Sequence, residues 1–245
     1  MGRVFTAAAL VPAPPLLVPQ LAGQSSEAAD LRLAAVAAVR ELGRGSRRWI
    51  ALGVGQAGRP VHRVGVGRAV VGTFLGFGVD LRTALDPTTD GPPDPELELS
   101  ALIAGWLRSE VDSEVCIDLH TVATDATPQE CHHLGVSLRE QMDADPEPVA
   151  LLVLADGART LTKKAPGSFD ERAAPVQTMV DEALATGDRA AVESLDPTLC
   201  ADVGMDGRAP WQTLAGVFAS APPRAAQSYR GAPFGVGYHV GMWRP

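Results

Sequence analysis

The chain of 245 residues is long enough to bury its own core, and its share of hydrophobic residues, 46%, is that of a globular protein. A formal net charge of -8 with scattered arginines makes nucleic acid a poor partner, because phosphate binding needs clustered lysines and arginines. No apolar run reaches the roughly 18 residues of a membrane span, and three widely spaced cysteines argue against disulfides or a zinc site. We therefore expect a cytoplasmic protein that forms one domain over residues 1–245.

The first quarter of the chain alternates strand and helix signals. Val4–Leu10 is an apolar run of strand length, and the prolines that follow it must take the chain out of the sheet as an extended loop. Ser25 or Ser26 can cap a helix that ends near Gly45, and Trp49–Val54 reads as the second strand. The order of strand, helix and strand predicts a parallel pair with a helical crossover.

The next stretch gives weaker signals. Val61–Val71 alternates apolar with polar residues or glycine and predicts a strand or hairpin, whereas Gly72–Leu81 is too rich in glycine for a regular element. Pro87–Pro95 has the composition of a linker, but the chain on each side is too incomplete to fold alone. Leu97–Arg108 predicts a helix, and Glu114–Val122 predicts a strand.

The second half begins with a strong helix start at residues 127–130. Thr127 can cap the helix, a proline follows at the first helical position, and Glu130 completes a capping box for a helix that runs to Met142. Val149–Leu154 predicts a fully buried strand, and helices fill the remainder until a last strand at Tyr238–Trp243. These elements predict an α/β fold with a central, mostly parallel sheet flanked by helices.

The loop that follows the buried strand Val149–Leu154 is the candidate binding site. Ligands of open α/β sheets bind outside the carboxyl ends of the strands, and this loop combines hydrogen-bonding side chains, cations and glycines. The candidate ligand-binding residues are Asp156, Gly157, Arg159, Thr160, Thr162, Lys163, Gly167 and Tyr238. The alternative is a solvated surface loop with ordinary ion pairs.

Other constellations are less specific. Asp118 and His120 lie two apart in a predicted strand and therefore face the same side, but no third iron ligand follows from the spacing. His132 and His133 are neighbours on a helix, so they point about 100° apart and suit one metal ion poorly. Gly53-Val54-Gly55 is only part of a dinucleotide fingerprint, and no helix follows it.

Five stretches of the chain together resemble the subunit-B-like family of class III extradiol dioxygenases, in its actinobacterial branch. They occur in the expected order and span nearly the whole sequence. The stretches are VPAPPLLVPQLAG (Val11–Gly23), GTFLGFGVDL (Gly72–Leu81), LADGARTLTKKAPGSFDERAAPV (Leu154–Val176), GRAPWQTLAG (Gly207–Gly216) and GAPFGVGYHVGMW (Gly231–Trp243).

This resemblance implies an α/β fold and, in the wider superfamily, a ferrous ion held by two histidines and a glutamate. That ion opens catechol rings with dioxygen, and a further histidine acts as acid and base. The positions that match these four residues hold none of them: Ala13, the segment 53–58, Ala158 with Arg159, and Gly207 with Arg208. Alanine, glycine and arginine offer ferrous iron no suitable donor.

We therefore expect a degenerate relative of these dioxygenases that needs no cofactor and binds a small anionic or aromatic ligand at the ancestral site. Whether the ligand is turned over stays open at this stage. One alternative is an active dioxygenase whose ferrous iron uses other ligands, such as Asp118 and His120. Another is a non-catalytic subunit of a larger complex, or a homo-oligomer.

Overall fold

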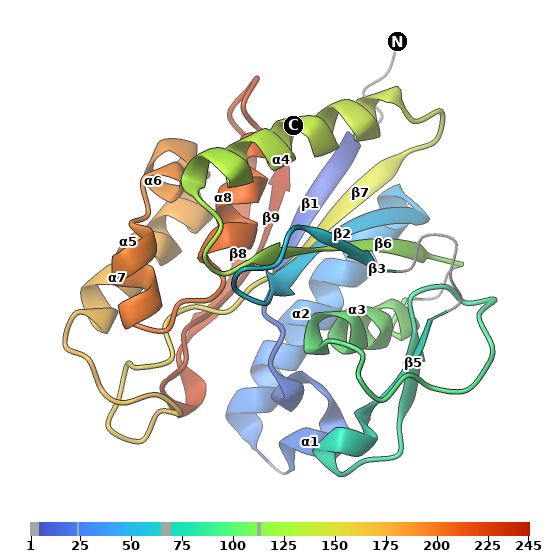
Figure 1. Ribbon diagram of the computed structural model, residues 1–245, viewed down its shortest axis with the longest axis horizontal. Helices are drawn as coiled ribbons and strands as arrows, with labels where there is room; N and C mark the ends of the chain where they lie inside the picture. The colour runs from blue at the N-terminus through green and yellow to red at the C-terminus, as the bar shows by residue number, and fades with distance from the viewer. Residues whose placement is uncertain (1–4, 24, 65–69, 112–113) are drawn as a thin grey trace.

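The computed structural model describes residues 5–23, 25–64, 70–111 and 114–245, and these form a seven-stranded sheet covered by helices (Figure 1). Val4, where the first strand was predicted to begin, lies outside the described residues. From one edge to the other, the strands are β3 (His62–Val64), β6 (Cys116–Ala123), β2 (Arg48–Gly55), β7 (Val149–Leu154), β1 (Phe5–Val11), β9 (Tyr238–Arg244) and β8 (Arg224–Gly231).

The four central strands β6, β2, β7 and β1 run parallel, while β3, β9 and β8 pair antiparallel with their neighbours. Every residue of β7 is buried, as expected for a central strand with helices on both of its faces. The predicted α/β architecture is therefore confirmed, with a sheet that is parallel at its centre and antiparallel at both edges.

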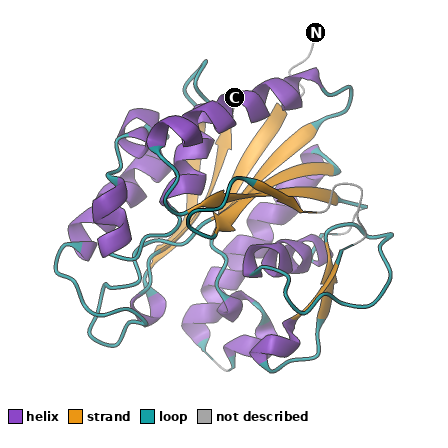
Figure 2. Ribbon diagram, in the orientation of Figure 1, coloured by secondary structure: helices purple, strands orange, loops and turns teal. Residues whose placement is uncertain are grey.

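Two layers of helices enclose the sheet (Figure 2). One layer packs its apolar residues on the face that carries Ala9 and Ala51, and the other packs on the face that carries Leu10 and Ile50. The first layer consists of α2 (Ser26–Gly45) and α3 (Leu99–Ser109), next to the short α1 (Pro19–Ala22). The second consists of α4 (Pro128–Ala144), α5 (Ala173–Thr186), α6 (Arg189–Glu193), α7 (Pro197–Asp202) and α8 (Arg208–Val217). Among the described helices, none is both long and apolar enough to traverse a bilayer.

The two strongest helix starts lie where the sequence puts them. Ser25 caps α2 by accepting a hydrogen bond from the backbone N–H of Ala28. Thr127 accepts from the backbone N–H of Glu130, whose carboxylate accepts in return from the backbone N–H of Thr127, so the capping box of α4 is complete. Both contacts are local, which is why a sequence pattern reveals them.

The glycine-rich region differs from its prediction. It was expected to lack regular structure, yet β4 (Val71–Thr73) begins it and pairs antiparallel with β5 (Arg82–Ala84), across the turn η2 (Phe74–Phe77). A Cβ on Gly72 would lie 2.4 Å from the side chain of Leu102, so this glycine allows β4 to pack closely on α3. Part of the predicted strand over residues 61–71 forms β3, and residues 65–69 lie outside the described residues.

The edge strand β8 was missed altogether, because helices were predicted throughout this region. Its residues are exposed or half-buried, and its register with β9 shifts between Gln227 and Tyr229. Such a strand has no buried face and therefore shows no alternation of apolar and polar residues.

Candidate functional site

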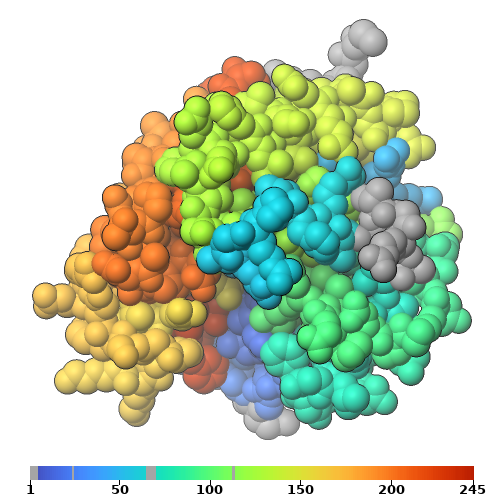
Figure 3. Space-filling view, in the orientation of Figure 1, coloured from blue at the N-terminus to red at the C-terminus, as the bar shows by residue number. Residues whose placement is uncertain are grey.

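A cavity of about 700 Å³ lies at the carboxyl ends of β1, β2 and β7, the edge where open α/β sheets bind ligands. Its lining comes from the loops after these three strands, from the starts of α3 and α8, and from β9. In the space-filling view, the blue segment that follows β1 lies recessed between the yellow loop after β7 and the green segments of α3 (Figure 3).

Asp156, the second residue after β7, is half-buried in this cavity. Its Oδ1 atom accepts a hydrogen bond of 2.8 Å from the backbone N–H of Ala13, which joins the loops after β7 and β1. Burial raises the pKa of the Asp156 carboxyl to about 7, and the nearby charge of Asp206 raises it further against the opposing effect of the Ala13 N–H. Asp156 can thus hold or release a proton near neutral pH, as a general acid or base must.

A buried glutamine is hydrogen-bonded to the backbone of the loop that carries Asp156. Gln177, on α5, accepts a hydrogen bond of 2.8 Å from the backbone N–H of Ala158 and donates one of 2.9 Å to Asp181. Ideal Cβ atoms on Gly157 and Gly237 would lie only 2.1 and 2.2 Å from the Gln177 Oε1 atom. The absence of a Cβ at both glycines therefore lets the Gln177 amide approach the backbone closely at the base of the cavity.

The buried Asp181 carboxylate, which accepts the hydrogen bond from Gln177, also forms an ion pair with Arg230. The distance from Arg230 Nε to Asp181 Oδ2 is 3.0 Å. The Nδ1 atom of His239 lies 4.0 Å from Asp181 Oδ1, and neither ring nitrogen of this buried histidine has a hydrogen-bond partner among the described residues. Burial, together with the charge of Arg230, lowers the pKa of His239 to about 4. The histidine is therefore neutral at physiological pH.

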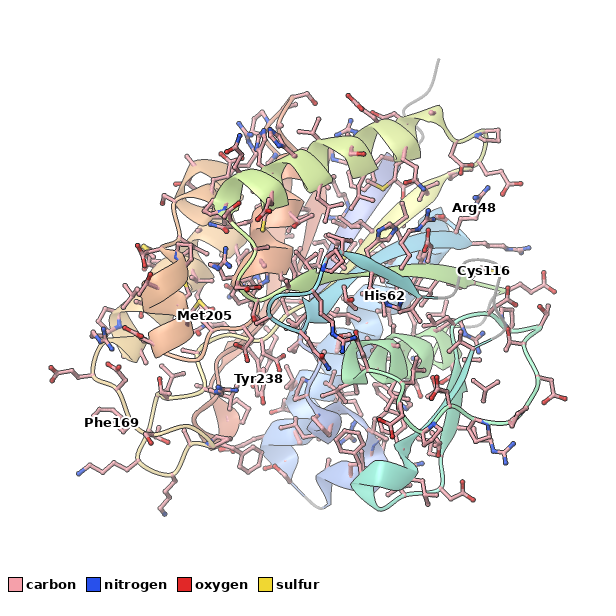
Figure 4. The ribbon with its side chains drawn as sticks, in the orientation of Figure 1. Arg48, His62, Cys116, Phe169, Met205 and Tyr238 are labelled. Carbon is pink, nitrogen blue, oxygen red and sulfur yellow. The ribbon has the colours of Figure 1, made fainter. Side chains whose placement is uncertain are left out.

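The structure brings four of the predicted site residues together in the cavity lining: Asp156, Gly157, Arg159 and Tyr238. Tyr238 is almost fully buried, and Figure 4 shows it between the loop after β7 and the segment after β1. Burial raises the pKa of its phenol, and the Asp156 charge contributes in the same direction. Trp211, in α8, is 2% exposed and lies in the core.

The other four predicted residues lie outside the cavity lining. Thr160 is buried and donates a hydrogen bond of 2.9 Å to the carbonyl oxygen of Val203. Thr162 and Lys163 are exposed on the outer part of the loop. The N–H of Gly167 donates to the carbonyl oxygen of Arg159, so this glycine allows the loop to pack on itself.

Two carboxyl groups of the cavity were missed in the sequence. Glu98 immediately precedes the first residue of α3, and Asp206 immediately precedes Gly207 at the start of α8. Asp206 pairs with Arg159 across 3.3 Å. The only sequence signal for Glu98 is its place at a helix start, and an acidic residue there is normally explained by the helix dipole alone.

Asp118 and His120 lie side by side on β6, as their spacing predicts, but neither lines the cavity. The His120 Nε2 atom is 3.5 Å from Asp118 Oδ2, and Arg63 forms an ion pair with the same carboxylate. Burial acts to raise the pKa of Asp118, but His120 and Arg63 outweigh it and lower the pKa. Among the described residues, no three His, Cys, Asp or Glu side chains gather closely enough to hold a metal ion.

The structure also shows what surrounds the positions that the sequence resemblance would assign to iron ligands. Ala13 uses its backbone N–H to hold Asp156. Arg208 is 1% exposed, and its guanidinium donates to Gln212 and to the carbonyl oxygens of Thr124 and Ala126. A buried guanidinium is a cation without a lone pair to offer, so this donor set does not fit a ferrous ion.

No protein-family model and no curated protein matches the chain. Among solved structures, the fold is similar to that of the uncharacterized protein JW3007 from Escherichia coli K12. The likeness covers 97% of this chain and 99% of that one, with a TM-score of 0.58 and 10% sequence identity. At this identity the likeness shows the fold alone, because one fold can serve many functions.

Proposed function

We propose that the protein binds a small ligand with a largely apolar or aromatic body in the cavity beside Asp156. We further propose that it is a degenerate relative of the class III extradiol dioxygenases, without their iron ligands. The observation that supports both ideas is the cavity of about 700 Å³ at the carboxyl ends of the parallel strands, a volume suited to a small molecule.

The composition of the lining favours an apolar or aromatic ligand over an anion. Pro14, Pro15, Leu99, Val236 and Tyr238 supply apolar and aromatic walls. Most small-molecule sites combine such walls with a few polar groups that orient the ligand. Lys163, the cation expected to attract an anion, is exposed outside the lining.

The positions of the sequence stretches support the family proposal. Four of the five stretches that resemble the extradiol dioxygenases supply residues to the one cavity: Ala13, Asp156, Gly207 and Tyr238 come from different stretches. A resemblance confined to the hydrophobic core would not gather around a hollow in this way, because core residues are selected for packing.

A fragment screen tests the binding proposal. Small aromatic molecules are screened by ligand-observed NMR against the parent, against Ala57→Trp, and against Ala190→Trp as the matched control. Ala57 is exposed at the cavity rim, whereas Ala190 is exposed on α6 and outside the lining. We expect hits that bind the parent and the control but not Ala57→Trp, and hits that bind all three equally would refute the proposal.

Iron loading tests the family proposal. The protein is purified without oxygen, offered ferrous iron, freed of the excess, and analysed for metal per chain and for catechol-dependent oxygen uptake. We expect neither stoichiometric iron nor oxygen uptake. About one iron per chain together with uptake would instead identify an active dioxygenase with atypical ligands, and His120→Ala would test whether the pair on β6 holds that iron.

A further inference from the structure

The cavity lining holds more negative than positive charge. Its ionisable carboxyl and basic groups are Glu98, Asp156, Asp206 and Arg159. Arg159 is already paired with Asp206, at 3.3 Å. Within the described part of the chain, Glu98 and Asp156 have no ion-pair partner, so the only cation of the lining leaves two carboxyl groups uncompensated.

Glu98 is the more informative of these two groups. It occupies the N-cap position of α3, yet its side chain makes no capping hydrogen bond to the helix. Its Oε2 atom is buried and has no hydrogen-bond partner among the described residues. A buried carboxyl oxygen of this kind destabilises the protein unless a hydrogen-bond donor meets it.

Glu98 also forms part of a smaller neighbouring hollow of about 230 Å³, whose lining includes Arg59 and His62. The buried Oε2 atom of Glu98 accepts a hydrogen bond from neither of these basic groups. The Glu98 carboxylate therefore lines two hollows, and no described residue of either one forms an ion pair with it. A ligand with a positively charged donor would satisfy it.

We propose that the ligand is an organic amine, with a protonated amino group directed at Asp156 and Glu98 and an apolar or aromatic body against the walls of the cavity. This inference rests on the proposed function and specifies its ligand class. An ammonium group supplies both the positive charge and the hydrogen-bond donors that the two carboxyl groups lack. The net charge of -8 on the whole chain also attracts cations rather than anions.

Three probes with similar bodies and different charges test the inference. They are 2-phenylethylamine, which is cationic, 2-phenylethanol, which is neutral, and 3-phenylpropanoate, which is anionic. Affinities are measured by isothermal titration calorimetry at pH 8 and low salt, where Asp156 is ionised. We expect the amine to bind about tenfold more tightly than the alcohol, and the carboxylate to bind more weakly than both.

Two variants then assign the effect to the proposed carboxyl groups. Glu98→Gln and Asp156→Asn keep the size of each side chain and remove its charge. Each should lower the affinity for the amine by about fivefold or more and leave the affinity for the alcohol unchanged, since a desolvated charged hydrogen bond is stronger than a neutral one. Glu114→Gln, an exposed change at the opposite end of the sheet, serves as the control.

The outcomes separate this inference from the proposed function. Tighter binding of the carboxylate, or equal affinity for all three probes, overturns the amine assignment while leaving a functional cavity. Failure of all three probes to bind also overturns it, and the fragment screen with Ala57→Trp then decides independently whether the cavity binds anything.

Discussion

Two hollows of nearly equal size lie at opposite ends of the parallel strands, and their charges differ. The cavity at the carboxyl ends, about 700 Å³, contains two carboxyl groups that have no cationic partner among the described residues. The groove at the amino ends, about 710 Å³, contains four arginines: Arg40, Arg44, Arg47 and Arg48. Figure 4 shows Arg48 and Tyr238 far apart in the molecule, one from each hollow.

The arginine groove is largely neutralised by its own surroundings. Arg40 pairs with Glu110, Arg47 with Glu114, and Arg48 with Asp145 and Glu147. Most arginines of this groove are therefore neutralised by nearby carboxylates, whereas the carboxyl groups of Glu98 and Asp156 have no cationic partner among the described residues. Unbalanced charge in a partly buried place distinguishes a candidate site better than volume does.

The largest difference between the two ends should lie in how much their buried side-chain hydrogen bonds contribute to the free energy of unfolding. We expect Gln177→Leu to lower the free energy of unfolding by about 2–4 kcal/mol, because it leaves the Ala158 N–H and the Asp181 carboxylate without this partner. At the amino end, Ser46→Ala removes a hydroxyl that is hydrogen-bonded to the carbonyl oxygens of Arg48 and Pro148. This change should lower the free energy of unfolding by about 1 kcal/mol. Urea denaturation measures both, and equal losses would contradict the comparison.

The loss of folding stability at low pH should arise in part from His239, at the carboxyl end of the parallel strands. The pKa of His239 is about 4 in the folded protein, below its value of 6.5 in the unfolded chain. Its neutral form therefore contributes stability that is present above pH 6.5 and is lost as the pH falls toward 4. His239→Leu should remove about 2–3 kcal/mol of the parent's loss between pH 7 and pH 4, at about 1.4 kcal/mol per pKa unit.

The measurement is the unfolding free energy as a function of pH. Any cost of the different shape of the leucine side chain is the same at every pH, so the dependence of the unfolding free energy on pH alone decides the test. His133→Gln, an exposed change on α4, should leave the slope unaltered. An unaltered slope in His239→Leu would mean that this histidine is not the group that titrates.

Asp156 should have the opposite dependence. Its pKa of about 7 in the folded protein exceeds the ordinary 3.8, so its contribution to stability is present below pH 3.8 and is lost as the pH rises through 7. Asp156→Asn keeps an acceptor for the Ala13 N–H and removes the charge next to Asp206. We expect it to stabilise the protein by about 1–2 kcal/mol at pH 8, allowing for partial solvation, and by little at pH 4.

The smallest effect is expected in the arginine groove. Arg48 pairs with Asp145 at 3.1 Å, but its side chain is 52% exposed. A double-mutant cycle on this pair should give less than about 1 kcal/mol, and high salt should reduce it further. A larger coupling that persists in salt would make the groove a rigid, desolvated site and weaken the contrast between the two ends.

The sequence predicts those parts of the fold that depend on local signals. The capping box at Thr127 and the uniformly apolar run of β7 are each legible within a few residues, and both are confirmed. The strands β4, β5 and β8 were missed for a physical reason. The strand β4 depends on packing against α3, much later in the chain, as the close approach of Gly72 to Leu102 illustrates, and β8 has no buried face. Neither feature leaves a pattern that strand propensity can detect.

The sequence predicted only those residues of the candidate site whose position follows from local signals. Asp156 follows a recognisable strand, so its place at the ligand edge can be inferred from the sequence. Glu98 and Asp206 reach the cavity from the starts of two helices, and Gln177 looks like any polar residue of a helix until the fold buries it beneath Gly157. Which carboxyl groups lack a cationic partner also depends on neighbours in space, so the sequence alone does not predict it.

The position of β1 in the sheet has a consequence for how the chain is made. Phe5 pairs with Val149 on one side of β1, and Ala8 pairs with Trp243 on the other, so this early strand has no neighbour until much later residues exist. At synthesis rates of about 5–20 residues per second, β1 waits on the order of ten seconds for β7. An apolar strand kept waiting that long is an aggregation hazard, and such long-range closure predicts slow folding and a need for protection by chaperones during translation.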